Sequence, residues 1–277
     1  MDTKSQKTPL YTVYGPKMLE EMTWAEVAEA LKETDIALPV VGATENHGPH
    51  SPLSSDSIQG VEVAKRAARK LSAEGIKVVV GPLVPFGCST HHMGFPGTIT
   101  LQTVTFHQLL KDVLHCLVHH GFRNIAVISG HGGNKASIYL AVDEIYKETK
   151  IRIASPDWFG VLYEHYMKVA KSDSPEREFH QGERATSLTL AACPELVDMN
   201  KAGRYFSEEY DRKYKRYGSR VNMSYLLDYD MRATTSVGYI GDAAAATKEV
   251  GELLYEACAE FVADFVKNEF VTRNNNS

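Results

Sequence analysis

The sequence predicts an α/β fold with three layers, in which a mostly parallel central sheet lies between two layers of helices. Short apolar runs typical of buried strands alternate along the chain with longer segments whose apolar residues recur at helical spacing. Since parallel neighbours need a crossover between them, this alternation favours a parallel sheet with helices on both faces. No internal repeat and no linker-like stretch interrupts the pattern, so residues 1–277 are expected to form a single domain.

The individual elements follow from the same apolar patterns. Thr23, with Glu26 three positions later, indicates a capping box at the start of the first helix. Strands are expected over 36–41, 76–80, 124–129 and 151–154. Helices are expected over 55–71, 103–120, 135–147, 158–170 and 180–193, with a last long helix capped by Asp242.

Two segments show no such pattern. Residues 1–17 are interpreted as an N-terminal arm or an edge element. Residues 201–237 are rich in Tyr and Arg and are interpreted as an oligomer interface, a cover over the substrate, or both.

Composition excludes several classes of protein. The net charge of −5 and the lack of basic runs argue against nucleic acid and membrane surfaces as partners. The first residues lack an apolar signal core, and no stretch reaches the roughly 20 apolar residues of a membrane span. The 4 cysteines are far apart, which predicts neither a disulfide framework nor a zinc ribbon. These features are typical of a cytoplasmic protein.

The loop after the first expected strand is the strongest candidate for chemistry. It carries Glu45, His47, His50 and Asp56. Residues two apart in an extended segment point the same way, so Glu45 and His47 can address one point, and Gly48 permits a bend that brings Asp56 back to it. Carboxylates and neutral imidazoles are ligands for a divalent cation. The alternative is a loop whose acids cap helices and whose histidines are solvated, but four such residues within one loop favour metal.

Two further loops lie where the same site is expected. Residues 81–100 include the pair His91-His92, and residues 130–134 read Gly-His-Gly-Gly-Asn. Both follow predicted strands, and sites in open parallel sheets form at the carboxyl ends of the strands. The glycines of 130–134 could alternatively cradle a phosphate, but no Lys-Ser/Thr pair accompanies them.

Together, these motifs resemble the creatininase (creatinine amidohydrolase) family. The family pattern Glu-x-His-Gly-Pro-His-x-Pro with a following Asp matches residues 45–56, and its His-x-x-Phe-Pro-Gly-Thr segment matches 92–98. Its Gly-His-Gly-Gly-Asn matches 130–134, its His-x-Gly-Glu with Thr-Ser matches 180–187, and its Gly-x-x-Gly-Asp matches 238–242. The matches keep the family order and extend over roughly residues 35 to 255, so their combination is specific.

The resemblance implies two divalent ions per subunit (zinc, manganese or iron) at the carboxyl edge of the sheet. It also implies a ring-like homo-oligomer, often a hexamer. Carried over by position, the ligands are Glu45, His47, Asp56 and His131, with Asp56 bridging the ions. Creatininase has a Glu where this chain has Gly133, so Glu183 is expected to complete the second site. Ala185 replaces an acid that the family commonly has, which argues against creatinine as the substrate.

The implied chemistry assigns further roles. His180 and Glu183 are the expected catalytic residues. A proton must reach the leaving group, and His180 is expected to deliver it; the alternative is that His180 caps a helix or supports a ligand. His92, Asn134 and Trp158 are expected to bind substrate, the alternatives being packing for His92 and Trp158 and loop orientation for Asn134. His50 is expected to orient a metal ligand.

The expected function is that of a metal-dependent hydrolase acting on a small cyclic amide, formamide or cyclic ketone. An alternative within the family is a carbon–carbon bond hydrolase that opens a carbocyclic diketone in inositol breakdown. An alternative of another class is a non-catalytic metal- or ligand-binding member, or a peptide-processing member of a biosynthetic cluster. The same ion-activated water would serve each of the hydrolases, so the motifs leave these alternatives open.

Overall fold

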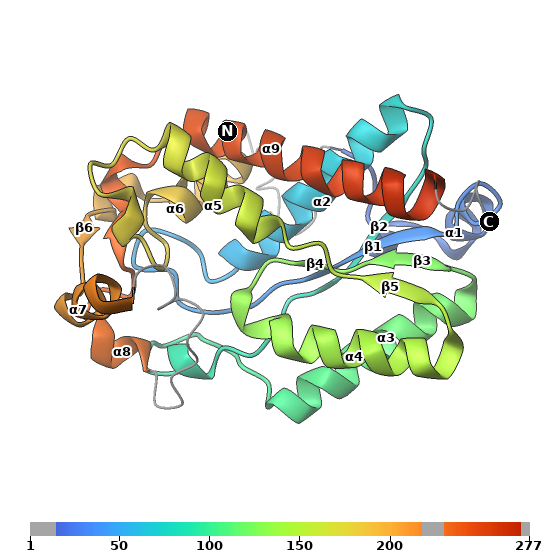
Figure 1. Cartoon of the computed structure of the whole chain (residues 1–277), viewed down its shortest axis with the longest axis horizontal. Coiled ribbons are helices and arrows are strands. Elements are labelled where there is room, and N and C mark those ends of the chain that lie inside the picture. Colours follow the sequence, from blue (N-terminus) through green and yellow to red (C-terminus); the bar gives the residue numbers. More distant parts are fainter. Residues whose placement is uncertain (1–14, 218–229, 273–277) are drawn as a thin grey trace, which may run out of the picture.

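The computed structural model describes residues 15–217 and 230–272 and contains the expected parallel sheet (Figure 1). Strands β2, β1, β3 and β5 lie side by side in that order, all parallel, and β4 continues the sheet beside β1. Their bounds are Ile36–Val41 (β1), Val79–Val84 (β2), Asn124–Ala126 (β3), Ile128–Ser129 (β4) and Arg152–Ala154 (β5).

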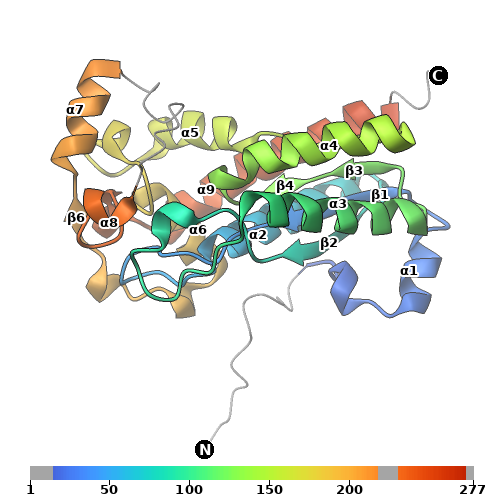
Figure 2. The same cartoon turned by 90° about the horizontal axis from the view of Figure 1, so that it is seen from below.

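Helices cover both faces of this sheet. In the described part of the chain the α-helices are α1 (Trp24–Ala30), α2 (Ser55–Ala73), α3 (Thr103–His120), α4 (Lys135–Thr149), α5 (Trp158–Val169), α6 (Glu183–Ala192), α7 (Glu208–Tyr217), α8 (Met231–Thr234) and α9 (Lys248–Val266). Helices α2, α5 and α9 lie above the sheet in Figure 1, and α3 and α4 lie below it. Figure 2, seen from below, shows α3 and α4 in front of the strands. The three-layer α/β/α expectation is therefore confirmed.

The alternation of side chains along β1 explains why the protein has two hydrophobic cores. Ile36, Leu38 and Val40 point into the core that contains α2, α5, α6 and α9. Ala37 and Val41 point into the core that contains α3 and α4. Successive side chains of a strand face opposite sides of a sheet, so one apolar run serves both cores.

Several element boundaries differ from the expectation. Helix α6 begins at Glu183 rather than at residue 180, and the strand expected over 124–129 is divided into β3 and β4. The second strand begins at Val79 rather than at residue 76 and continues to Val84, because its hydrogen-bonded partner β1 begins at Ile36, and Ala37 is paired with Val79. The last helix begins at Lys248, where the Thr247 side chain accepts the N–H of Val250. Asp242 instead lies in a short strand, β7 (Gly241–Asp242), which pairs with β6 (Arg204–Tyr205).

The segment 201–237, left unassigned from sequence, contains β6, α7 and α8 in its described part. These elements gather at one end of the molecule (Figure 1). Most of the expected arm, 1–17, and residues 218–229 lie outside the described residues. None of the described helices combines the length and apolar character needed to cross a membrane.

Candidate metal centre

The loops at the carboxyl edge of the sheet bring acids and histidines from distant parts of the sequence into one cluster. The loop after β1 supplies Glu45 and His47, and the first turn of α2 supplies Asp56. The short 3-10 helix Thr90–His92, which follows β2, supplies His92. His131 follows β4 after one intervening residue, Gly130. The parallel arrangement of the strands places these loops at the same edge.

A glycine allows α2 to approach the sheet closely enough to present Asp56. A Cβ atom added at Gly130 would lie 2.1 Å from the backbone oxygen of Asp56. No side chain fits at that separation, so the start of α2 packs directly against the end of β4. Asp56 is thereby held beside His131, which is the next residue after Gly130.

The two carboxylates each face more than one histidine. Glu45 Oε1 lies 3.3 Å from His92 Nε2, and Glu45 Oε2 lies 3.4 Å from His131 Nε2. Asp56 Oδ1 lies 3.5 Å from His47 Nε2, and Asp56 Oδ2 lies 2.9 Å from His131 Nδ1. Each carboxylate oxygen therefore faces a different imidazole nitrogen. This arrangement is expected of acids that bind ions together with several histidine ligands.

Three groups of side chains in the described part of the chain could hold a metal ion, and Glu45 belongs to each. They are Glu45 with Asp56 and His131, Glu45 with His47 and His180, and Glu45 with His91 and His92. Within each group the ligand atoms lie within 4.8 Å of one another. The structure thus brings together the four sequence-predicted ligands other than Glu183, and adds histidines around them.

Buried polar atoms without hydrogen-bond partners show that the cluster fits a cation. Glu45 Oε2, both ring nitrogens of His47 and His92 Nδ1 are buried and have no hydrogen-bond partner among the described residues. Leaving one such atom unsatisfied costs about 1–3 kcal/mol, and several in one place call for a missing partner. A divalent ion would satisfy carboxylate and imidazole lone pairs together.

The charges of the cluster lead to the same conclusion. Burial raises the pKa of Glu45 to about 8, although His131 opposes this shift. Burial alone would lower the pKa of His131, but the carboxylates of Glu45 and Asp56 outweigh it and raise that pKa to about 9. Glu45 and His131 therefore keep their protons near neutral pH. These protons offset the negative charge of the buried acids, which a bound cation would otherwise offset.

Asp56 and the remaining histidines are in the protonation states that ligands need. Burial would raise the pKa of Asp56, but His47 and His131 outweigh it and hold that pKa below its ordinary value. Burial lowers the pKa of His47 and His92, that of His91 to about 4 and that of His180 to about 3. Metal binding requires an ionised carboxylate and a neutral imidazole, so these groups need lose no proton at neutral pH.

Glu183 does not take the place expected from its motif. Its Oε1 accepts the backbone N–H of Lys171 at 2.6 Å, and its Oε2 accepts that of Ser172 at 2.8 Å and the hydroxyl of Tyr166 at 3.2 Å. The side chain is fully buried and belongs to none of the described groups that could hold a metal. The structure therefore gives Glu183 an anchoring role for the chain after α5, instead of the expected roles as metal ligand and catalytic residue.

The residues expected to bind substrate also have other partners. The indole N–H of Trp158 donates to the backbone oxygen of Ser129 at 2.9 Å, and the side chain is fully buried in the core. The amide of Asn134 bonds the backbone of Gly42 and of Cys88, which ties three loops together. His92 faces Glu45 rather than a free space. These placements differ from the expectation because neighbouring backbone groups and acids occupy each side chain.

His50 and His91 complete the account of the histidines. His50 Nε2 lies 3.0 Å from Thr186 Oγ1, and its ring meets Tyr239 edge-on, so it supports the loop between Glu45 and Asp56. His91 was named with His92 in the sequence but was given no role, and it stacks on His131 with ring centroids 5.8 Å apart. Its position next to His92 in a long loop was the only signal available.

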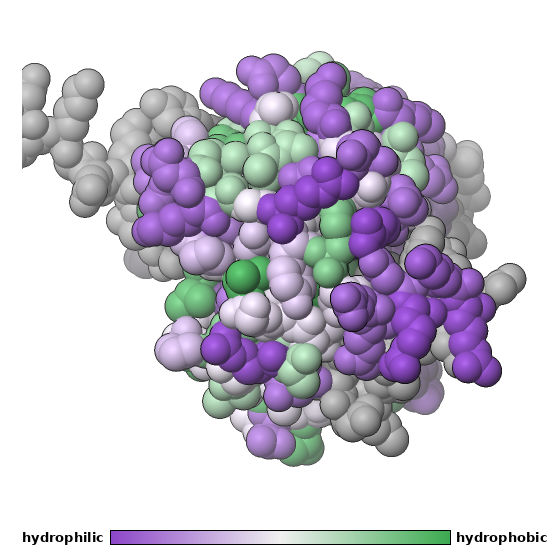
Figure 3. All heavy atoms as spheres, turned by 90° about the vertical axis from the view of Figure 1, so that its left-hand side faces the viewer, coloured by the Kyte–Doolittle hydropathy of each residue, from purple (hydrophilic) through white to green (hydrophobic). Residues whose placement is uncertain are grey.

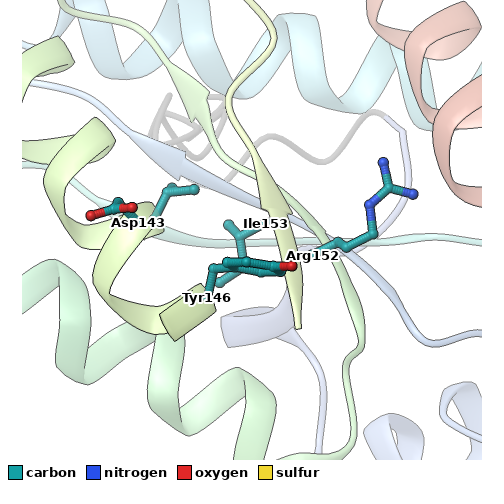
Figure 4. A pocket seen from close by; sticks show the side chains of 5 residues that line it. Asp143, Tyr146, Arg152 and Ile153 are labelled. Atoms are coloured by element: carbon teal, nitrogen blue, oxygen red, sulfur yellow. The ribbon is translucent and has the colours of Figure 1, made fainter. Parts of the chain in front are cut away.

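The end of the molecule that carries β6, α7 and α8 is shown in Figure 3. Pale and green residues occupy much of its centre, and strongly hydrophilic residues surround them. A separate hollow of about 400 Å³ lies between α4 and the edge strand β5 (Figure 4). It is lined by Asp143, Tyr146, Arg152 and other side chains that are not part of the metal centre.

The model of one protein family, described as creatininase (creatinine amidohydrolase), matches residues 20–266, which is most of the chain. This chain belongs to the creatininase family. The fold and hydrolase class expected from the motifs are thereby confirmed.

Family relatives differ in what they act on. Creatinine amidohydrolase of Pseudomonas putida is 27% identical over 90% of this chain and 96% of its own length. A 3-dehydro-scyllo-inosose hydrolase of Thermotoga maritima is 28% identical over 64% of this chain and 57% of its own length. A mycofactocin precursor peptide peptidase of Mycolicibacterium smegmatis is 27% identical over 86% of this chain and 87% of its own length.

Solved structures of creatininases share the fold and contain metal. A structure described as the manganese form of creatininase superposes with a TM-score of 0.71 at 25% identity, covering 92% of this chain and 98% of the other. A zinc form of a creatininase variant gives a TM-score of 0.72 at 25% identity over the same shares of the two chains. Members of this family are therefore metal-dependent hydrolases, and the cluster around Glu45 is the candidate metal centre of this one.

Proposed function

We propose that this creatininase-family member hydrolyses a small cyclic amide, formamide or cyclic ketone, with two divalent ions held around Glu45. The observation that carries the proposal is the set of buried lone pairs on Glu45 and His47 that have no partner among the described residues. When bound there, such ions lower the pKa of water and polarise a carbonyl group. Zinc, manganese and iron each suit a centre of carboxylates and imidazoles.

Some side chains of the centre would hold the ions, and others lie on the side from which substrate would approach. Glu45, Asp56 and His131 form the most buried group and would hold one ion. Asp56 directs one oxygen toward His131 and the other toward His47, which supports a bridging role between two ions. His91 and His180 are the partly exposed members, so substrate is expected to approach on their side.

The substrate class rests on the relatives, of which the creatinine amidohydrolase supports cyclic amides as the first candidate. The inosose hydrolase among them supports cyclic ketones as a second candidate, in which a carbon–carbon bond is cleaved by the same activated water. Because mycofactocin precursor peptide peptidases are also among the relatives, peptides are the third substrate class to be tested.

A substrate panel tests the function. Protein freed of metal with a chelator and reloaded with zinc, manganese or iron would be incubated with lactams, formamides, cyclic diketones and short peptides, and products followed by mass spectrometry. We expect turnover of one class, lost on chelation and restored by metal. A metal-loaded protein that turns over none of them, or turnover that persists unchanged with chelator, would contradict the proposal.

We also propose that the protein acts as a homo-oligomer. Support comes from the large apolar side chains Met93, Ile99 and Val104, which are exposed on one loop and the helix after it. Sedimentation velocity would test this directly, since a mass of 30.7 kDa is expected for a single chain.

A further inference from the structure

His180 has a defined tautomer. Its Nε2 lies 2.8 Å from the backbone oxygen of Asn46. A carbonyl oxygen only accepts hydrogen bonds, so Nε2 carries the proton of the neutral ring and donates it to Asn46. The lone pair is therefore on Nδ1. Histidines that bind metals commonly donate their second ring N–H to a backbone carbonyl in this way, which orients the ring and fixes the binding nitrogen.

Two other ligand groups converge with His180. Ligand atoms of Glu45, His47 and His180 lie within 4.8 Å of one another. The His47 and His180 rings are nearly parallel, at 16°, with centroids 5.0 Å apart. Neither nitrogen of His47 has a hydrogen-bond partner among the described residues, so that ring still has a lone pair to offer.

The backbone fixes His180 in this position. Its N–H donates to the carbonyl of Ile240 at 3.2 Å, and the N–H of Ile240 donates back at 2.8 Å. This isolated antiparallel bridge links the segment before α6 to the segment before β7. His180 is thus held from both sides, as a preorganised ligand must be.

Among residues 15–217 and 230–272, neither of the acids expected from the family motifs takes this position instead. Glu183 is fully engaged with Lys171, Ser172 and Tyr166, as described above. A side chain at Gly133 is blocked as well, because a Cβ atom there would lie 2.4 Å from His131 Nε2 and 2.5 Å from the backbone oxygen of Cys88.

We propose that His180 is a metal ligand, through Nδ1, and that with Glu45 and His47 it holds the second ion of the centre. The inference rests on the proposed function and deepens it. It also replaces the expectation that His180 delivers a proton to the leaving group, because a ring bound through Nδ1 with Nε2–H committed to Asn46 has no proton free for that step.

Metal stoichiometry tests this assignment. Wild type and His180→Ala would be stripped with chelator, reloaded with excess zinc, desalted and analysed by plasma mass spectrometry. We expect about two ions per chain in the wild type and about one in His180→Ala. His180→Asp, which restores an ionised ligand, is expected to recover part of the lost occupancy. His180→Ala with an unchanged zinc content would overturn the proposal, whatever its activity.

A matched control separates ligation from general damage. His107→Ala also removes a partly buried histidine, but His107 lies against Glu144 of α4 and belongs to no group that could hold a metal in the described chain. We expect this variant to keep both ions. If it lost one as readily as His180→Ala, the effect would be structural and the assignment of His180 would fail.

A measurement on the wild type covers the case in which His180→Ala does not fold. Anomalous scattering from crystals of the zinc-loaded protein would locate the ions. We expect one of them about 2.1 Å from His180 Nδ1, the ordinary zinc–nitrogen distance. Ions that leave His180 uncoordinated would refute the inference and leave the hydrolase proposal standing. A His180-bound ion in a protein that turns over no substrate would instead contradict the proposed function alone.

Discussion

Single side chains in and around the candidate metal centre differ in the partners that they contact. Asp56 and Glu183 are both buried acids from the first turn of a helix, α2 and α6 respectively. Asp56 faces two histidines, whereas Glu183 accepts two backbone N–H groups and a tyrosine hydroxyl. Two buried acids in the first turn of a helix are therefore expected to respond differently to substitution.

Asp56→Ala is expected to abolish metal binding and turnover. It removes the acid that faces both His47 and His131, so neither ion keeps its ligand set. Zinc content after reloading and turnover of the identified substrate would be measured together. Asp35→Ala is the control, because Asp35 binds Asn124 at the opposite edge of the sheet and should keep the metal. A metal-loaded, active Asp56→Ala would contradict the assignment of the centre.

Glu183→Ala is expected to destabilise the protein by about 3 kcal/mol while the zinc content stays unchanged. The loss leaves the N–H groups of Lys171 and Ser172 and the hydroxyl of Tyr166 without their acceptor, and hydrogen bonds to charged groups contribute about 1.5–3 kcal/mol each. Urea denaturation and metal analysis would check the two statements. Loss of one zinc ion at unchanged stability would show that Glu183 is a ligand after all.

At the scale of elements, the contact between α2 and the sheet controls the site. Gly130→Ala would force a Cβ atom against the backbone oxygen of Asp56. We expect a loss of about 1–3 kcal/mol in the free energy of unfolding, since overpacking costs that much, together with weaker metal binding as Asp56 moves. Gly132→Ala is the matched control two residues away, because a Cβ there meets nothing within 4 Å. Equal effects of the two variants would show that the close approach is unimportant.

The elements themselves show where apolar periodicity is informative. Helices α2, α3 and α4 begin at the expected residues, because their apolar stripes pack on the sheet. The start of β2 and the start of α9 were misplaced. A strand begins where a partner strand offers hydrogen bonds, which depends on tertiary neighbours. The cap of α9 is Thr247 rather than the expected Asp242, because the Thr247 side chain accepts a helix N–H.

For the whole molecule, the metal-free protein is expected to lose stability as pH rises from about 7 to 9. The pKa of Glu45, raised to about 8, and that of His131, raised to about 9, mean that the folded state binds more protons than the unfolded chain in this range. Stability falls with pH wherever the folded state holds the extra protons. Thermal unfolding after chelation would show this as a falling melting temperature.

The zinc-loaded protein provides the comparison for that pH series. A bound ion replaces the retained protons, and a ligand that binds only the folded state stabilises it by about 2.7 kcal/mol at a hundred times its dissociation constant. The stabilisation by zinc should therefore increase from pH 7 to 9. A metal-free protein that becomes more stable over this range would contradict the charge balance described for the centre.

The sequence by itself determined the fold class and pointed to most residues of the candidate metal centre. Strand and helix periodicities are local, and Glu45, His47 and Asp56 lie close together in the chain, so their convergence could be inferred from one loop. His131 and the family followed from motifs that keep their order along the chain.

Only the tertiary structure showed the partners of the remaining residues. Glu183 and His180 are three positions apart, yet one is tied to backbone N–H groups after α5 and the other lies against His47. The partner of a side chain can lie far away in the sequence. For His180 it is the backbone oxygen of Asn46, which is 134 residues away and bonds His180 Nε2. The spacing within a motif cannot specify such a partner, because a shift of one residue along an extended segment turns the side chain to the opposite side.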